Sequence, residues 1–159
     1  MNPSKEQPIA KTEKSTISLR ICRAEQELSG KTSLAVLVRF FHRTLKPYED
    51  SVEDITRALT YAFDGTGGFL VLAQDKGELI GALLMLRTGM GGYVPENLLL
   101  FVGVRPEQRG KGVGGLLVER GLEEADGTVK LHVEYDNPAK RLYERIGFVS
   151  NYAEMRCEP

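Results

Sequence analysis

Cysteine is scarce in this chain of 159 residues, and the two cysteines, Cys22 and Cys157, lie far apart. Neither belongs to a CxxC pair or a cysteine–histidine cluster, so the sequence offers no zinc-binding pattern. We expect both thiols to be reduced. The longest apolar runs are too short to cross a bilayer, and no charged-then-apolar signal pattern opens the chain. We therefore expect a cytoplasmic protein with no metal and no membrane partner.

An excess of charge of either sign is also missing. The chain has 21 lysines and arginines against 22 aspartates and glutamates, for a formal net charge of −1. This balance argues against broad electrostatic binding to nucleic acid. With 42% apolar and 27% charged residues, the composition is that of an ordinary globular protein. The length suits one domain, which we place at residues 17–159 behind a flexible polar tail at residues 1–16.

Hydrophobic periodicity divides this domain into alternating strands and helices. The predicted strands cover residues 17–22, 69–73, 78–86, 98–104, 129–135 and 148–157. The predicted helices cover residues 30–44, 51–63, 112–125 and 138–147. The hairpin at residues 69–86 implies antiparallel pairing, and the helix between Val104 and Val129 implies a parallel crossover. We therefore predict an α/β domain of mixed α+β character, with helices on the faces of a mixed sheet.

One stretch, residues 104–115 (V-R-P-E-Q-R-G-K-G-V-G-G), lies between a predicted strand and a predicted helix. Its glycines let a bulky anion approach the backbone closely. The first amides of the helix lack internal partners and can bind phosphate, and Arg105, Arg109 and Lys111 add positive charge. A turn used only for chain reversal needs fewer basic residues and alternate glycines. The stretch therefore predicts a phosphate-binding loop.

Residues 110–115 also satisfy G-x-G-x-x-G, with Asp136 about where the dinucleotide motif needs a ribose-binding acid. Two features argue against a dinucleotide site. Residues 105–109 separate the strand from the first glycine, and only one strand–helix–strand unit follows Gly115, too little for a dinucleotide half-domain. The P-loop pattern G-x-x-x-x-G-K-[ST] does not occur.

Two signatures resemble those of a known family. Residues 109–114 (R-G-K-G-V-G) match R/Q-x-x-G-x-G/A, the acyl-CoA pyrophosphate motif of the GNAT family of N-acetyltransferases. Residues 136–148 resemble the family's second signature, N-x-x-A-x-x-L-Y-x-x-x-G-F, with Asp136 at the asparagine position and Asn137 beside it. The resemblance implies a single GNAT-like domain. Its sheet would be mixed, mostly antiparallel and made of about six or seven strands, flanked by about four helices.

The resemblance further implies transfer of an acetyl group from acetyl-CoA, the co-substrate, to an amine on a small molecule or peptide. The pantetheine arm would pair with the exposed backbone of residues 102–104, as an added strand does. The implied cofactor-binding residues are Val102, Gly103, Val104, Arg109, Gly110, Lys111, Gly112, Val113, Gly114 and Gly115, together with Asp136 or Asn137. Many relatives form dimers, which leaves a homodimer open.

Tyr143 occupies the position of the family's general acid. A phenol with a pKa of about 10 is protonated at neutral pH and can donate its proton to the departing thiolate. The general base is open between several groups. Histidine can act as a base near neutral pH, and His132 shares a face of the predicted strand with Glu134, while Glu96 or water are alternatives.

Loops on the acceptor side would shape the amine site. The resemblance points to the connection between the first two helices and to the loop before residue 98, with Tyr48, Glu49 and Tyr93 as contacts. Two other functions stay open: a regulatory module that holds acyl-CoA without turnover, and a less well supported dinucleotide-binding protein. The intact Tyr143 and the basic glycine loop favour the N-acetyltransferase.

Overall fold

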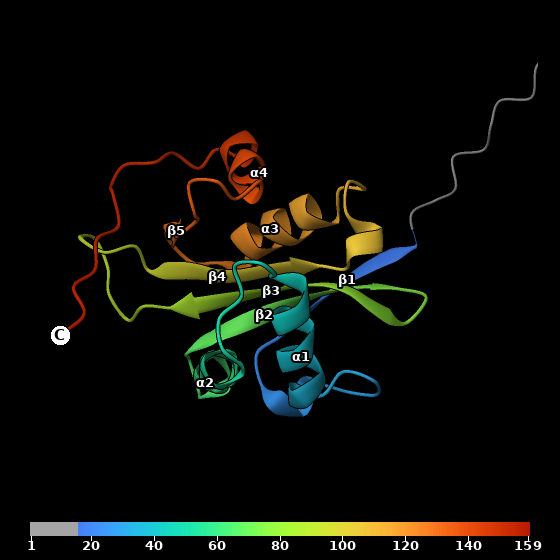
Figure 1. The fold of residues 1–159 in the computed structure, drawn as a ribbon. Coiled ribbons are helices and arrows are strands. Elements are labelled where there is room, and N and C mark those ends of the chain that lie inside the picture. Colours follow the sequence, from blue (N-terminus) through green and yellow to red (C-terminus); the bar gives the residue numbers. More distant parts are fainter. Residues whose placement is uncertain (1–15) are drawn as a thin grey trace, which may run out of the picture.

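The computed structural model describes residues 16–159, so the predicted tail lies outside the described residues except for Thr16. One sheet with the strand order β1-β2-β3-β4-β5 forms its centre (Figure 1). The first four strands pair antiparallel, and β5 runs parallel to β4. The strands are β1 (Ile17–Cys22), β2 (Gly68–Asp75), β3 (Glu78–Arg87), β4 (Asn97–Val104) and β5 (Val129–Leu131). The predicted mixed, mostly antiparallel sheet is confirmed.

Four α-helices cover the two faces of the sheet (Figure 1). One face carries α1 (Leu34–Thr44) and α2 (Val52–Phe63), and the other carries α3 (Val113–Glu124) and α4 (Ala139–Ile146). Two short 3-10 helices, η1 (Glu25–Glu27) and η2 (Pro106–Gln108), lie in connections. Ser33 and Ser51 begin α1 and α2 by accepting a backbone N–H with their side chains, which satisfies one amide that has no partner within the helix. The predicted number and order of helices are confirmed.

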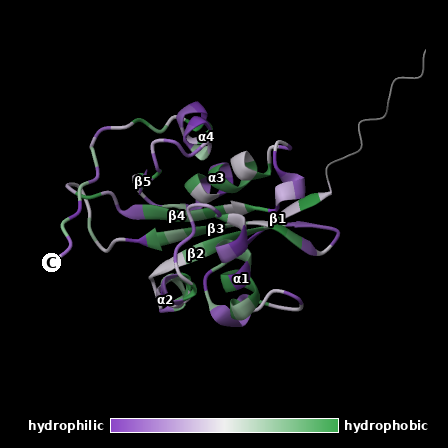
Figure 2. Ribbon diagram, viewed as in Figure 1, coloured by the Kyte–Doolittle hydropathy of each residue, from purple (hydrophilic) through white to green (hydrophobic). Residues whose placement is uncertain are grey.

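The sheet separates two hydrophobic cores. The central strands β2 and β3 are buried on both faces and are almost continuously apolar (Figure 2). On one face, Phe41 and Leu59 pack with the cluster that includes Leu84. On the other, Leu117 and Leu83 belong to a second cluster with residues of β2 and α4. Burying each of these side chains contributes about 1.5–3 kcal/mol, so the cores fix α1 and α3 against opposite faces.

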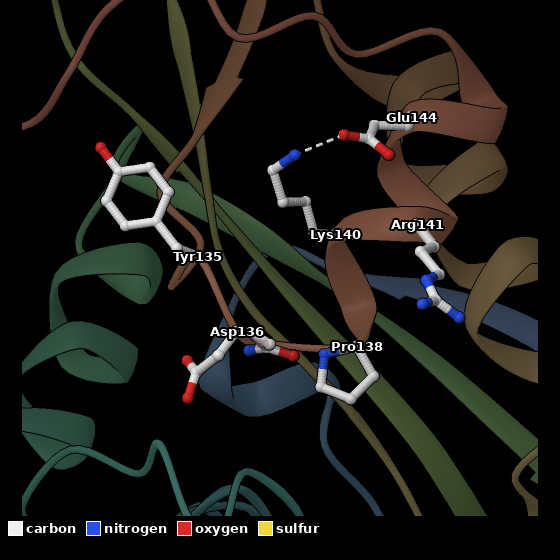
Figure 3. Close-up of a pocket in the computed structure, with 7 residues that line it drawn as sticks. Tyr135, Asp136, Pro138, Lys140, Arg141 and Glu144 are labelled. Atoms are coloured by element: carbon white, nitrogen blue, oxygen red, sulfur yellow. Dashed lines mark hydrogen bonds and ion pairs between the residues drawn. The ribbon is translucent and has the colours of Figure 1, made fainter.

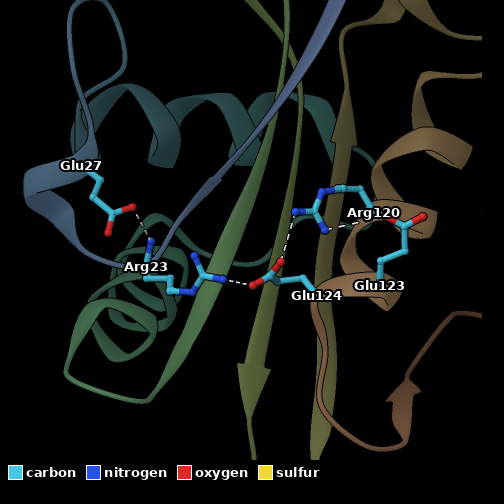
Figure 4. A network of polar contacts seen from close by, with 5 residues as sticks. All are labelled: Arg23, Glu27, Arg120, Glu123 and Glu124. Atoms are coloured by element: carbon cyan, nitrogen blue, oxygen red, sulfur yellow. Dashed lines mark hydrogen bonds and ion pairs between the residues drawn. The ribbon is translucent and has the colours of Figure 1, made fainter.

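A network of ion pairs joins the segment after β1 to α3 (Figure 4). The Glu124 carboxylate contacts the guanidinium groups of Arg23 and, at 3.1 Å, Arg120. Arg120 also lies 3.8 Å from Glu123, and the amide of Arg23 donates to Glu27. Glu124 is only 19% exposed, so this pairing is screened less than an ordinary surface ion pair. It fixes the edge strand β1 against the C-terminal end of α3.

Two sequence-based predictions about strands are wrong. The strand predicted at residues 129–135 ends at Leu131, and residues 148–157 form no strand. The sheet of residues 16–159 thus has five strands, fewer than expected. Val149, Tyr152 and Met155 are 75%, 92% and 88% exposed. The alternation of apolar and polar residues concerns side chains, but a strand also needs a neighbouring backbone to pair with its N–H and C=O groups. Residues 132–135 and 148–157 have no such neighbour.

One edge of β4 is open beyond the last residue that pairs with β5. Leu99 pairs with Met85 and Phe101 with Leu84, so Leu100 is an extra, bulged residue in β4. A bulge bends its strand and increases the local twist. Pairing between β4 and β5 stops at Leu99 and Leu131. From Leu100 to Val104, the edge of β4 that faces away from β3 has no strand partner among the described residues.

Candidate active site

The glycine loop connects the open part of β4 to the N-terminus of α3. Gly110 and Gly112 have φ angles of 75° and 84°, in the left-handed region, where a Cβ is sterically unfavourable. The first backbone hydrogen bond of α3 runs from Leu116 N to Gly112 O over 3.1 Å. The amides of residues 113–115 therefore precede the first donor of the helix and have no acceptor within it. Together with the helix dipole they present hydrogen-bond donors and positive partial charge, the features that suit an anion.

Two glycines of this loop have a second role that the sequence did not indicate. A Cβ at Gly114 would lie 3.2 Å from Leu142 Cδ2, and a Cβ at Gly115 would lie 3.8 Å from Leu142 Cδ1. The absence of side chains here lets α4 approach α3 closely. As a result, the helix that carries Tyr143 lies directly beside the N-terminus of α3.

The basic residues of the loop differ in their contacts. Arg109 turns its guanidinium toward the protein, where Nη2 donates to Thr44 O at 2.8 Å and Nε donates to Val104 O at 3.2 Å. Arg105 places Nη1 4.0 Å from the Glu107 carboxylate. Lys111 is exposed and forms no ion pair within residues 16–159. Lys111 is thus the loop cation with the greatest freedom to meet a ligand.

Tyr143 lies on α4 and is only 9% exposed. Its ring packs edge-on against Phe148, with ring centres 5.9 Å apart. Burial, and to a smaller extent the charge of Glu134, raises the pKa of Tyr143 to about 12, because both disfavour the phenolate. The phenol therefore stays protonated across the physiological pH range.

The turn before α4 separates the roles of Asp136 and Asn137. Asn137 caps the helix: its Oδ1 accepts from Ala139 N at 3.0 Å, and its Nδ2 donates to the Glu134 carboxylate at 2.9 Å. The carboxylate of Asp136 points away from α4 (Figure 3). A pocket of about 440 Å³ borders this turn, and its lining residues are Tyr135, Asp136, Asn137, Pro138, Lys140, Arg141 and Glu144. The side chain of Asn137 is thus engaged in holding the turn, whereas that of Asp136 faces outward.

Tyr48, in the connection between α1 and α2, lies near this turn. Burial, followed by the charge of Asp136, a hydrogen bond with Asp136 and the charge of Glu134, raises the pKa of Tyr48. Among the predicted acceptor contacts, Tyr48 therefore faces the acidic turn beyond β5. Glu49 is half-buried, and Tyr93 is 85% exposed.

The predicted bases lie in different surroundings. His132 and Glu134 are exposed and follow the end of β5, and the charge of Glu134 acts on both Tyr48 and Tyr143. Glu96 accepts a hydrogen bond from Thr128 N at 2.8 Å. Hydrogen bonds from backbone amides, its own and that of Thr128 first, lower the pKa of Glu96. A carboxylate stabilised in this way is a weaker base, so Glu96 is the least suited of the three.

Comparisons with known proteins identify the class. Residues 35–148 match the model of the acetyltransferase (GNAT) family. The chain is 35% identical over 98 residues to a mycothiol acetyltransferase of Streptomyces coelicolor, covering 58% of this chain and 30% of that protein. It is 32% identical over 111 residues to an acetyltransferase of Pectobacterium atrosepticum, covering 65% of this chain and 71% of that one.

The fold agrees with these matches. The crystal structure of an aminoglycoside acetyltransferase from an uncultured soil sample has a TM-score of 0.62 at 13% identity, with 90% of this chain and 98% of that chain covered. The fold and the glycine loop define an acetyltransferase-type α/β domain. The chain belongs to the acetyltransferase (GNAT) family. It spans 30% and 35% of the length of two mycothiol acetyltransferases that it matches.

The described residues contain neither a cluster of metal ligands nor a helix suited to span a membrane. No group of three or more histidine, cysteine, aspartate or glutamate side chains within residues 16–159 is arranged to hold a metal ion. No helix in the same part of the chain is long and apolar enough to cross a membrane.

Proposed function

We propose that the chain is an acetyl-CoA-dependent N-acetyltransferase that moves an acetyl group to a primary amine by direct attack. One arrangement carries the proposal. The open edge of β4 leads into the free amides at the start of α3, and close packing at Gly114 brings the helix of Tyr143 beside them. An extended acyl-CoA has a strand edge, an anion site and a proton donor available along one path.

The donor half of the site is built from backbone. The amides of residues 113–115 and the ammonium of Lys111 would hold the pyrophosphate, with Gly110 and Gly112 giving the backbone its approach. The edge of residues 102–104 would pair with the pantetheine arm, and an N–H there would polarise the thioester carbonyl. One such donor contributes about 3 kcal/mol of transition-state stabilisation. Asp136, at the start of the second signature, would border the donor, while Asn137 holds the turn.

Proton transfer would be divided between two sides of the site. Tyr143, protonated at neutral pH, would donate a proton to the departing thiolate. The attacking amine must first lose a proton, and Glu134 or His132, or water held by them, would take it. Glu134 is the better placed of the two because its charge reaches Tyr143 and Tyr48.

The similar proteins include both a mycothiol acetyltransferase and an aminoglycoside acetyltransferase, so similarity alone does not select the acceptor. We propose a small-molecule or peptide amine, with Tyr48 as a wall of its site. A cytoplasmic location and a homodimer stay predictions.

A paired assay tests the proposed function. Thermal shift measures binding of acetyl-CoA, and a free-thiol assay measures turnover over a panel of amino acids, polyamines, aminoglycosides and peptides. We expect stabilisation by acetyl-CoA and thiol release with at least one amine. Stabilisation without thiol release on any amine would instead support the regulatory module. Stabilisation by NAD or NADP but not by acetyl-CoA would support the dinucleotide-binding protein.

A further inference from the structure

Arg109 carries the first letter of the pyrophosphate motif, yet its guanidinium is bound to the protein. We propose that Arg109 is a positioning residue, which couples the phosphate-binding loop to the wall of the acceptor site, and that it does not bind the pyrophosphate. The inference rests on the proposed function. The motif alone would assign Arg109 to binding of the ligand.

The guanidinium joins three segments of the chain. Nη2 donates to the carbonyl of Thr44 at 2.8 Å, and Nε donates to the carbonyl of Val104 at 3.2 Å. Thr44 is the last residue of α1, so its carbonyl has no partner within the helix and lies at the negative end of the helix dipole. A cation at this position makes a charge-assisted hydrogen bond. One side chain thus connects the end of α1, the end of β4 and the glycine loop.

The end of α1 packs tightly on β4. Thr44 is 6% exposed and donates from Oγ1 to Phe40 O at 2.8 Å. A Cβ added at Gly103 would overlap Thr44 Oγ1. Gly103 lies in the open part of β4 that would hold the donor. A shift of Thr44 would therefore be transmitted to the strand edge, because close-packed interiors transmit strain.

Backbone hydrogen bonds connect the end of α1 to the acceptor side of the site. Leu45 N donates to Phe41 O at 3.0 Å, and Tyr48 N donates to Leu45 O at 2.9 Å. This tight turn carries the chain from the end of α1 to Tyr48, which faces Asp136. Holding Thr44 thus also holds the turn that places Tyr48. Without Arg109, the acceptor wall should be looser whether or not the donor carries a pyrophosphate.

Lys111 provides a matched comparison. It lies in the same loop, carries the same charge and, like Arg109, is exposed and makes no ion pair in the described part of the chain. Arg109, in contrast, already donates two of its N–H groups to carbonyl oxygens. Binding a phosphate with the same edge of the guanidinium would require breaking both bonds.

The test compares R109Q and K111Q with two donors, acetyl-CoA and S-acetylpantetheine, which lacks the pyrophosphate. We expect K111Q to raise the KM for acetyl-CoA and to leave reactions with S-acetylpantetheine unchanged. R109Q should raise the KM for the amine roughly tenfold with both donors, the scale of losing a charged hydrogen bond. A defect of R109Q confined to acetyl-CoA, or no defect with either donor, would overturn the inference.

Two further measurements guard against misfolding and against failure of the proposed function. R109K keeps the charge but cannot span both carbonyls with a planar fork, so we expect it to behave like R109Q. Rescue by R109K would point to a simple phosphate contact. Amide exchange at Leu45 and Tyr48 should accelerate in R109Q and not in K111Q, independently of activity; unchanged exchange would also overturn the inference. If the wild-type chain releases no thiol with any amine, the proposed function fails separately.

Discussion

Tyr48 and Asp136 lie close enough for the carboxylate to act on the phenol, although Tyr48 precedes α2 and Asp136 follows β5. Burial, then the charge of Asp136 and the hydrogen bond to it, raise the pKa of Tyr48. We expect D136N to lower the pKa of Tyr48, because the phenolate would no longer face a negative charge. The measurement is an ultraviolet phenolate titration, assigned by difference against Y48F. D64N, at the exposed end of α2, is the control, and an unshifted Tyr48 in D136N would show that the two groups do not interact in solution.

The hydroxyl of Tyr143 should matter for turnover and little for stability. No hydrogen bond within residues 16–159 contributes to the pKa shift of this hydroxyl. The aromatic ring would keep its packing on Phe148 in Y143F. We expect Y143F to lower kcat by about 10²- to 10⁴-fold, the usual loss for a general acid, with little change in Tm. Steady-state kinetics and thermal unfolding check both expectations. Y135F, at a tyrosine that is 86% exposed, should retain full activity; equal kcat in wild type and Y143F would exclude the acid role.

The raised pKa of Tyr143 also predicts a loss of stability in alkali. Folding raises this pKa from 10.0 to about 12, so the folded chain holds the proton more tightly than the unfolded chain does. The stabilisation is fully present below pH 10 and is lost as the pH rises toward 12, by about 3 kcal/mol in total. Urea unfolding of wild type and Y143F across this range measures the difference. Parallel curves for the two proteins would contradict the shift.

Glu96 should contribute to stability in the opposite pH range. Backbone hydrogen bonds lower its pKa below the ordinary 4.5, so its contribution is present above that value and is lost as the pH falls through the folded pKa. We expect E96Q to weaken the acid dependence of unfolding, measured by urea titration at several acidic pH values. E119Q, on the exposed surface of α3, is the control. Because Glu96 is engaged with Thr128, turnover of E96Q should persist; its loss in a folded variant would restore Glu96 as the base.

Gly103 should tolerate no side chain. A Cβ there would overlap Thr44 Oγ1, and forcing a methyl group into a packed contact costs about 1–3 kcal/mol. We expect G103A to be destabilised by that amount and to lose activity together with stability, as measured by denaturant unfolding and thiol release. G91A is the matched control, because a Cβ at Gly91 would lie 3.7 Å from Glu96 Oε1, an ordinary contact. A G103A as stable as wild type would show that α1 can move away from β4.

Much of the site could be predicted because its signals are local. The glycine loop is recognisable from residues adjacent in the chain: φ angles at Gly110 and Gly112 and the free amides of α3 depend on the loop and helix alone. Tyr143 and the order of the elements followed from motif spacing and periodicity in the same way. Asn137 as a helix cap also obeys a short-range rule, but the family motif drew attention to its possible contact with the cofactor instead.

The sequence by itself determined the family, the helices, the antiparallel hairpin and the glycine loop, since periodicity, caps and glycine positions act over a few residues. Only the tertiary structure decided which edges pair and which side chains meet. Pairing between β4 and β5 stops at Leu99 and Leu131, and residues 148–157 pair with no strand. The partners of Arg109 and Tyr48, Thr44 and Asp136, lie far away in the chain. Such contacts depend on how separate elements pack, and no local pattern of residues records them.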